Sequence, residues 1–150
     1  LQDVCIGSDS NVWASDVYNI WQLSSGTVTK FPMDVSRPDD ICEGPDGNLW
    51  IADRDSIIWK VTPAGVKTGY YFPGTDFTGI CAGPDGNLWA TDQADGFVFN
   101  GKVWKITTSG VGTSYAVTDL CTDICAGPDG NLWACAGTPF GNGAVWKITT

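Results

Sequence analysis

Short runs of apolar residues, separated by clusters of Gly, Pro, Asp and Asn, follow one another along the whole chain. In four of these runs Trp shares one face with Leu, Val or Ile, while Ile or Val shares the other face with Lys or Gln. These runs lie at 20–23, 58–61, 103–106 and 145–148. A period of two, with β-branched and aromatic residues and turn residues at each end, is typical of β-strands. The pattern predicts an all-β chain.

One ten-residue segment recurs three times almost unchanged and once in degenerate form. Segments 41–50, 80–89 and 124–133 share the pattern Ile-Cys-x-Gly-Pro-Asp-Gly-Asn-Leu-Trp, and segment 4–13 is Val-Cys-Ile-Gly-Ser-Asp-Ser-Asn-Val-Trp. Its cysteine lies at positions 5, 42, 81 and 125, so the units are 37, 39 and 44 residues apart. Such periods lie in or near the range of β-propeller blades. The repeat therefore predicts four units.

Each unit carries the signals of a small antiparallel sheet. Val/Ile-Cys-x-Gly is a first strand and Leu-Trp-x-x-Asp a second, because the Asp and Gly between them tolerate the positive φ of a hairpin turn. The Trp-containing runs are third strands, and fourth strands are expected at 27–31, 66–70 and 111–115. The last unit ends with its third strand. We predict one domain, 1–150: a four-bladed β-propeller whose blades span about 1–38, 39–77, 78–121 and 122–150, the last lacking its own outer strand.

The eight Trp residues fall two to a unit, one on the second strand and one on the third. In a propeller both faces of a radial sheet pack on neighbouring blades, and large aromatic side chains fill that space. We therefore expect these Trp side chains to form the core between blades rather than a row of sugar-stacking sites.

Net charge and cysteine usage narrow the function classes. With 8 basic and 17 acidic residues the net charge is -9, which excludes nucleic acid as a partner. No apolar run reaches the 18 residues of a membrane span, so no membrane insertion is expected. Six Cys, none in CxxC spacing, and a sequence that begins at Leu1 favour a processed, extracellular (secreted) protein.

The run Gly-Pro-Asp-Gly-Asn-Leu-Trp-x-x-Asp, followed by Ile-x-Lys-Ile-Thr-x-x-Gly, resembles the blade repeat of the virginiamycin B lyase (streptogramin lyase) family and its β-propeller relatives. The resemblance covers nearly the whole chain. It implies seven blades, and a histidine general base beside a magnesium ion held by acidic residues. The present sequence has four repeats and no His. We therefore predict no lyase activity, although a carboxylate with a raised pKa is an alternative general base.

Six aspartates at the ends of first and second strands form a candidate metal site. A turn closing between Gly44 and Leu49 would place Asp40 opposite Asp53 and, in the same register, Asp3 opposite Asp16. It would also place Asp92 opposite Gly79 and Asp123 opposite Ala136. Like charges directly opposite each other are destabilising. A calcium or magnesium ion would compensate such an oxygen-only cluster. The alternative is that each carboxylate binds nearby backbone N–H groups. The six residues are Asp3, Asp16, Asp40, Asp53, Asp92 and Asp123.

Three further features interrupt the repeat. Cys121 and Cys135 have no counterparts in the other units, and a disulfide between them would stabilise the last blade by about 3 kcal/mol. Two insertions between second and third strands carry Phe97 with Phe99 and Phe140. These aromatic loops suit either stacking on sugar rings or contact with another protein.

Four functions remain open. The first is a non-catalytic, secreted structural module, in which the open edge of blade four recruits other copies of the chain and builds a fibre head to tail. The second is a propeller that binds a carbohydrate or another small ligand at its channel mouth. The third is the lyase disfavoured above, and the fourth is a larger ring shared by two chains.

Overall fold

The computed structural model describes residues 1–33, 37–93, 101–137 and 143–150, and within them every regular element is a β-strand. Blade one contains β1 (Val4–Ile6), β2 (Val12–Ser15), β3 (Asn19–Ser24) and β4 (Thr27–Pro32). Blade two contains β5 (Pro38–Glu43), β6 (Leu49–Asp53), β7 (Ile57–Val61) and β8 (Lys67–Tyr71). Blade three contains β9 (Phe77–Ala82), β10 (Leu88–Asp92), β11 (Lys102–Ile106) and β12 (Gly112–Ala116). Blade four contains β13 (Leu120–Ala126), β14 (Leu132–Gly137) and β15 (Ala144–Ile148).

Each blade is an antiparallel meander whose strands pair in chain order. The turn after the first strand of blades two, three and four has a Gly in the left-handed region, with φ of 71° to 74° at Gly47, Gly86 and Gly130, as the Asp-Gly-Asn pattern predicts. The predicted all-β propeller blades are confirmed, including a last blade of three strands within the described residues. No helix in those residues is long and apolar enough to cross a membrane.

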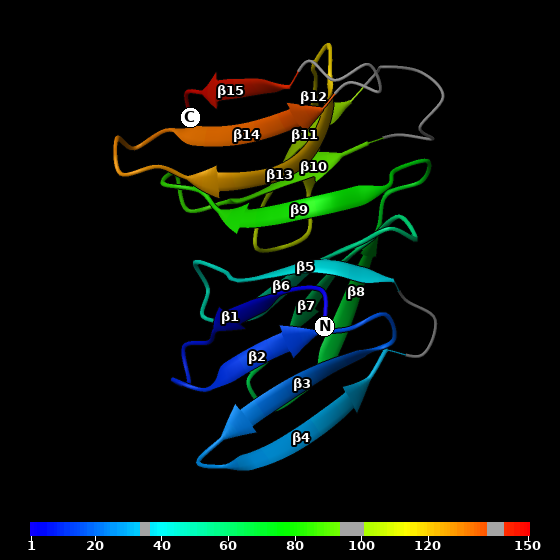
Figure 1. Cartoon of the computed structure of the whole chain (residues 1–150), viewed down its shortest axis with the longest axis vertical. Helices are drawn as coiled ribbons and strands as arrows, with labels where there is room; N and C mark the ends of the chain where they lie inside the picture. The colour runs from blue at the N-terminus through cyan, green and yellow to red at the C-terminus, as the bar shows by residue number, and fades with distance from the viewer. Residues whose placement is uncertain (34–36, 94–100, 138–142) are drawn as a thin grey trace.

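The four blades form an open arc. Figure 1 shows the sheets stacked in chain order, with blade one at the bottom and blade four at the top. Throughout the described part of the chain, every extensive contact between sheets joins consecutive blades, for example β5 with β9 and β9 with β13. Blades one and four therefore each have a neighbour on one face only.

Three apolar clusters fill the three spaces between consecutive blades. In the space between blades two and three, Trp50 and Ile58 from one blade pack on Ile80 and Leu88 from the next. The spaces between blades one and two and between blades three and four are filled in the same way. The prediction that Trp forms this core is confirmed for the second-strand residues Trp13, Trp50 and Trp89, which are buried. The third-strand Trp residues are only half-buried.

A repeated polar unit holds the second-strand Trp in place. In blade two the turn carboxylate of Asp46 accepts a hydrogen bond from Trp50 Nε1 at 2.9 Å and pairs with Lys60 Nζ at 2.7 Å. Lys60 also lies over the Trp50 ring, 5.4 Å from its centroid. Against the opposing effect of burial, these hydrogen bonds lower the pKa of Asp46 to about 2. The same three residue types recur as Asp85, Trp89 and Lys105 and as Asp129, Trp133 and Lys147.

The outer strand of one blade is covered by a turn of the next. Tyr70 on β8 stacks on Trp50 with ring centroids 5.7 Å apart, and Gly110, in the turn after β11, lies against the Tyr70 ring. Gly110 has a φ of 84°, so its position excludes a side chain both by conformation and by contact. Phe31 and Gly65 make the equivalent contact one blade earlier.

We predict that Gly110→Ala destabilises the fold by about 2 to 4 kcal/mol, because left-handed strain adds to a clash with the Tyr70 ring. Gly74→Ala is the matched control. Its φ is 77°, but a Cβ there would meet nothing within 4 Å. We expect it to lose only about 1 kcal/mol. Urea unfolding of both variants measures the difference, and equal losses would contradict the proposed contact with Tyr70.

Candidate functional site

The six predicted site aspartates do not converge on one point. In blade two Asp40 pairs with Ala52 rather than with Asp53, and a bulge between Pro38 and Asp40 then places Asp53 opposite Pro38. Asp123 likewise pairs with Cys135 instead of Ala136. The predicted carboxylate pairs are therefore wrong, because the hairpin pairs Leu49 with Glu43 and not with Gly44, which moves the register by one residue.

The same correction applies to the other two pairs. Asp3 exchanges hydrogen bonds with Ser15, not with Asp16. Asp92 pairs with Phe77 rather than Gly79. Among the described residues, no group of three or more Asp, Glu or Cys side chains is arranged to hold a metal ion.

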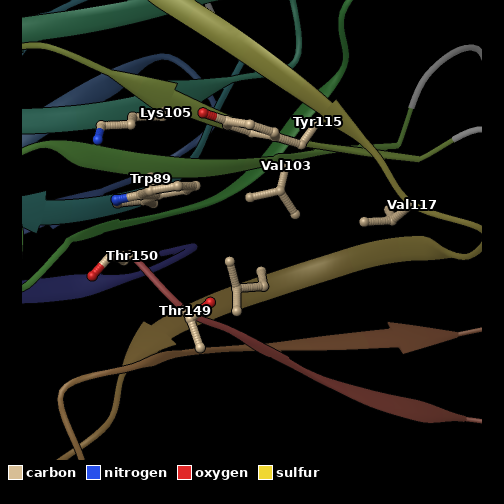
Figure 2. Close-up of a pocket in the computed structure, with 8 residues that line it drawn as sticks. Trp89, Val103, Lys105, Tyr115, Val117, Thr149 and Thr150 are labelled. Atoms are coloured by element: carbon tan, nitrogen blue, oxygen red, sulfur yellow. The ribbon is translucent and has the colours of Figure 1, made fainter.

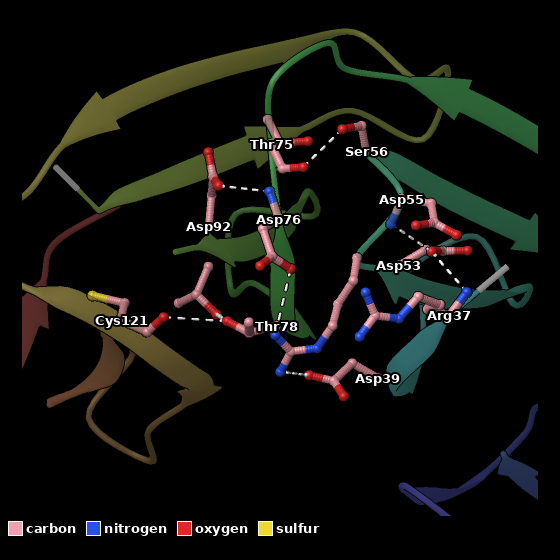
Figure 3. Close-up of polar contacts among 12 residues, drawn as sticks. Arg37, Asp39, Asp53, Asp55, Ser56, Thr75, Asp76, Thr78, Asp92 and Cys121 are labelled. Atoms are coloured by element: carbon pink, nitrogen blue, oxygen red, sulfur yellow. Dashed lines mark hydrogen bonds and ion pairs between the residues drawn. The ribbon is translucent and has the colours of Figure 1, made fainter. Parts of the chain in front are cut away.

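The second-strand aspartates bind backbone N–H groups and the indole of a third-strand Trp. Asp53 accepts from Arg37 N at 3.0 Å, Asp55 N at 2.8 Å and Trp59 Nε1 at 2.9 Å. Figure 3 shows its backbone contacts together with the bond from Asp76 N to Asp92 in blade three. Asp16 and Asp92 accept from Trp21 and Trp104 in the same way. Local binding, the alternative to a metal site, therefore accounts for Asp16, Asp53 and Asp92.

Blade four uses a different residue for this contact. Ala136 occupies the position of Asp16, Asp53 and Asp92, and Trp146 Nε1 instead donates to Asp119 at 3.2 Å. Asp119 lies in the segment that enters blade four, so the repeat pattern gave no signal for it. The contact ties that segment to the outer strand of the blade.

The first-strand aspartates connect one blade to the next. Asp40 Oδ1 accepts from the backbone N of Ile41, and its Oδ2 accepts from Ile80 N of blade three at 2.7 Å. Asp3 Oδ2 similarly accepts from Ile41 N at 3.3 Å. Asp123 of blade four accepts the local bond, from Ile124 N at 2.7 Å. The carboxylates of Asp3 and Asp40 are thus inter-blade acceptors, because a following blade presents an N–H to each.

Asp40 is the most perturbed of these carboxyl groups. Burial and a hydrogen bond with the Asp3 carboxyl raise its pKa from 3.8 to about 8. The hydrogen bond from Ile80 N opposes this shift, and the charges of Asp3 and Asp123 add to it. The protonated carboxyl of Asp40 can donate a hydrogen bond to the Asp3 carboxylate.

The cysteine prediction is corrected. Cys121 and Cys135 are both free thiols, and Cys121 is buried against blade three whereas Cys135 is exposed on the opposite face of blade four. The bulge between Cys121 and Asp123 separates the two thiols, because it places Cys121 opposite Ala136. Cys121 therefore lies on the face of the sheet that Ala136 shares, and Cys135 lies on the other face. The other four cysteines are free as well, and burial raises the pKa of the Cys5 and Cys81 thiols to about 12. The predicted aromatic loop residues Phe97, Phe99 and Phe140 lie outside the described residues.

A hollow of about 260 Å³ lies between blades three and four, next to β15. Figure 2 shows Trp89, Tyr115 and Val103 on one side of it and Thr149 with Thr150 on the other. Tyr115 stacks on Trp89 as Tyr70 stacks on Trp50. In the earlier blades this space holds the turn that contains Gly65 or Gly110. The hollow beside Tyr115 therefore lies at the position that this turn occupies in the earlier blades.

The first and last blades each leave one apolar face uncovered. We call the face of a blade that is turned toward the next blade its forward face, and the opposite one its rear face. The rear face of blade one exposes Val4, Val12 and Leu23. The forward face of blade four exposes Cys135 and Val145. The sequence did not reveal these faces, because their residues match those that are buried inside the arc.

Comparison with solved structures supports the resemblance found in the repeat. Virginiamycin B lyase from Staphylococcus aureus superposes with a TM-score of 0.80 and 26% identity over 98% of this chain, which spans 55% of the lyase chain. The extracellular domain of a one-component system from B. thetaiotaomicron superposes at 0.73 and 13% identity, covering 96% of this chain and 21% of that one. The WD40 β-propeller domain of Doa1 superposes at 0.73 and 15% identity, over 96% of this chain and 49% of that chain. No family model matches the sequence, and no curated protein matches it.

We predict that Asp40→Asn removes a loss of stability that the wild type shows as pH rises from about 4 to about 8. In this range the unfolded chain ionises Asp40 while the folded chain keeps it protonated, so the unfolded state binds fewer protons and stability falls. The amide introduced by the substitution mimics the protonated carboxyl toward Asp3. Urea unfolding at several pH values should show the variant gaining at least about 1 kcal/mol over the wild type by pH 8.

The matched control is Asp55→Asn, which removes one charge at an exposed position. We expect it to shift stability by a similar small amount at every pH. If the Asp40→Asn curve runs parallel to that of the wild type, a protonated Asp40 in the folded chain is refuted.

Proposed function

We propose that this chain is a non-catalytic structural module that assembles with further copies of itself outside the cell. The observation that carries the proposal is the pair of uncovered apolar faces at the ends of the arc. Val145 is 70% exposed and Val4 is 59% exposed. The residues in the same repeat positions inside the arc, Ile58 and Ile80, are buried.

Burial of these faces would supply a substantial driving force for association. Moving a Val side chain fully out of water is worth about 1.5 kcal/mol or more, and each end of the arc carries several apolar side chains. Soluble monomers seldom expose contiguous apolar surfaces of this kind, and larger ones mark interaction sites. The two faces carry the same kinds of residue as the three apolar interfaces between consecutive blades.

The outer edge of β15 supports the same function. Among the described strands, β15 pairs with β14 on one side only, whereas the third strands of the other blades also pair with a fourth strand. An unpaired edge presents N–H and C=O groups to strands of other chains unless charged residues block it. Lys147 is the charged residue on this strand, and it pairs with Asp129.

The sequence supports a non-catalytic role. The resemblance to streptogramin lyases implies a histidine general base, and this chain contains no His. The chain also spans about half of the lyase length, so that the activity of the whole lyase does not transfer to it. An extracellular location agrees with the extracellular domain found among the similar structures. It gains no support from disulfides, since the described cysteines are free.

Ligand binding is the second candidate function. The hollow beside Trp89 and Tyr115 favours it, because stacked aromatic rings beside Lys105 suit a sugar or another flat ligand. A protein that only binds a ligand at this hollow would remain a monomer, since its end faces would not contact another copy.

We predict that the purified 150-residue chain forms discrete assemblies at micromolar concentration. Multi-angle light scattering should give a mass at least twice the 16.0 kDa of one chain. Because each copy carries a net charge of -9, repulsion between copies opposes association, and a large increase in salt concentration should shift the equilibrium toward the assembly. A folded 16.0 kDa monomer under all these conditions would rule out self-assembly.

A further inference from the structure

We infer that the forward face of blade four docks on the rear face of blade one of a second copy, in the register of the internal interfaces, and that two copies close an eight-bladed ring. This inference rests on the proposed function, because it specifies how the copies assemble. It is independent of the edge of β15, which would recruit a copy by strand pairing instead.

The internal interfaces follow one rule. On the forward face of blade two, Trp50, Ala52 and Ile58 are buried. They pack on the rear face of blade three, whose buried residues include Ile80 and Leu88. The equivalent interfaces use Trp13 and Ile20 against blade two, and Trp89 and Val103 against blade four.

The forward face of blade four has Trp and two small or aliphatic residues at the corresponding positions. Trp133, Cys135 and Val145 correspond to Trp50, Ala52 and Ile58 of blade two. They line a shallow hollow of about 180 Å³ together with Cys125. The face is therefore shaped like those that receive a blade inside the arc.

The rear face of blade one supplies the matching surface. Val4, Val12 and Leu23 occupy the positions at which blade three has Ile80, Leu88 and Ile106, all three of them buried. Ala14 stands where blades three and four have Ala90 and Ala134. All four of these rear-face positions are therefore apolar on blade one, as they are on blade three.

A hydrogen bond would fix the same register. Inside the arc, the first-strand carboxylates Asp3 and Asp40 accept from the backbone N of Ile41 and Ile80 in the following blade. Asp123 is the equivalent carboxylate of blade four, and Val4 N is the equivalent donor of blade one. Docking in register brings Asp123 of one copy to Val4 N of the other.

Closure by two copies requires only a small decrease in the curvature that the arc shares with the lyase. The chain superposes over 98% of its length on 55% of a lyase for which the resemblance implies seven blades. Seven blades require a turn of about 51° per blade and eight require about 45°, so closure by two copies decreases each turn by about 6°, within the range of blade numbers that propellers adopt. Two identical interfaces related by a two-fold axis then close the ring, so the assembly stops at two copies.

Two substitutions test the inference, one on each face. Val145→Asp places a charge on the forward face of blade four, and Val4→Asp places one on the rear face of blade one. Both positions are exposed in the single chain, so both variants should fold. Val66→Asp is the matched control, because Val66 is exposed on the turn before β8 and belongs to neither face. Sedimentation velocity should show a dimer for wild type and Val66→Asp, and at least a tenfold weaker association for each face variant.

Mixing the two face variants distinguishes this geometry from the others. Val145→Asp keeps an intact blade one and Val4→Asp keeps an intact blade four. An equimolar mixture should therefore form a 1:1 pair through one intact interface, although each variant alone is a monomer. Docking between identical faces would instead let each variant dimerise by itself. Assembly that persists unchanged in both variants would assign it to the β15 edge and overturn the inference.

Thiol reactivity gives an independent readout. Cys125 and Cys135 are exposed on the forward face of blade four, whereas Cys121 is buried. Alkylation of Cys125 and Cys135 should be at least tenfold slower in the wild-type assembly than in Val145→Asp, with Cys121 slow in both. A wild-type monomer would defeat the proposed function itself. An assembly in which Cys125 and Cys135 react as fast as in Val145→Asp would defeat only the docking mode.

Discussion

The apolar contact between the forward face of one blade and the rear face of the next is the interaction on which the structure depends. A single antiparallel meander of three or four short strands cannot bury either of its faces alone. Each of the three internal contacts buries a Trp and an aliphatic residue from one blade against aliphatic residues from the next. The fold is therefore a series of similar interfaces, and its two ends carry one half of such an interface each.

Polar contacts set the register of these interfaces. The turn carboxylates hold the second-strand Trp through the indole N–H, as Asp46 holds Trp50. The first-strand carboxylates reach the backbone of the next blade, as Asp40 reaches Ile80. The abundant Asp of this acidic chain thus has a structural use at nearly every repeat position. The negative charge that results opposes association between copies, so apolar burial has to exceed it.

The repeat predicted the strands and the packing role of the second-strand Trp because both depend on local pattern. Residues 49–53 form a strand, and Trp50 is buried, as expected. The bulge beside Asp40 could not be predicted, since it is one extra residue in a strand with no local mark. The carboxylate pairs were wrong for another reason, because the hairpin pairs Glu43 with Leu49, one residue away from the expected register. The disulfide was expected because Cys121 and Cys135 lie outside the repeat, and that pattern does not show which face of the sheet each side chain occupies. The open arc could not be predicted from the sequence either. Val145 and Ile58 occupy the same repeat position, and they differ only in whether a following blade covers them.

Direct imaging tests the central claim, that the two end faces of the arc are halves of one interface. Cryo-electron microscopy of the wild-type assembly should give class averages of a ring with eight blades and two-fold symmetry. Isolated four-bladed arcs, or copies joined through the outer edge of β15 with both end faces still bare, would contradict it.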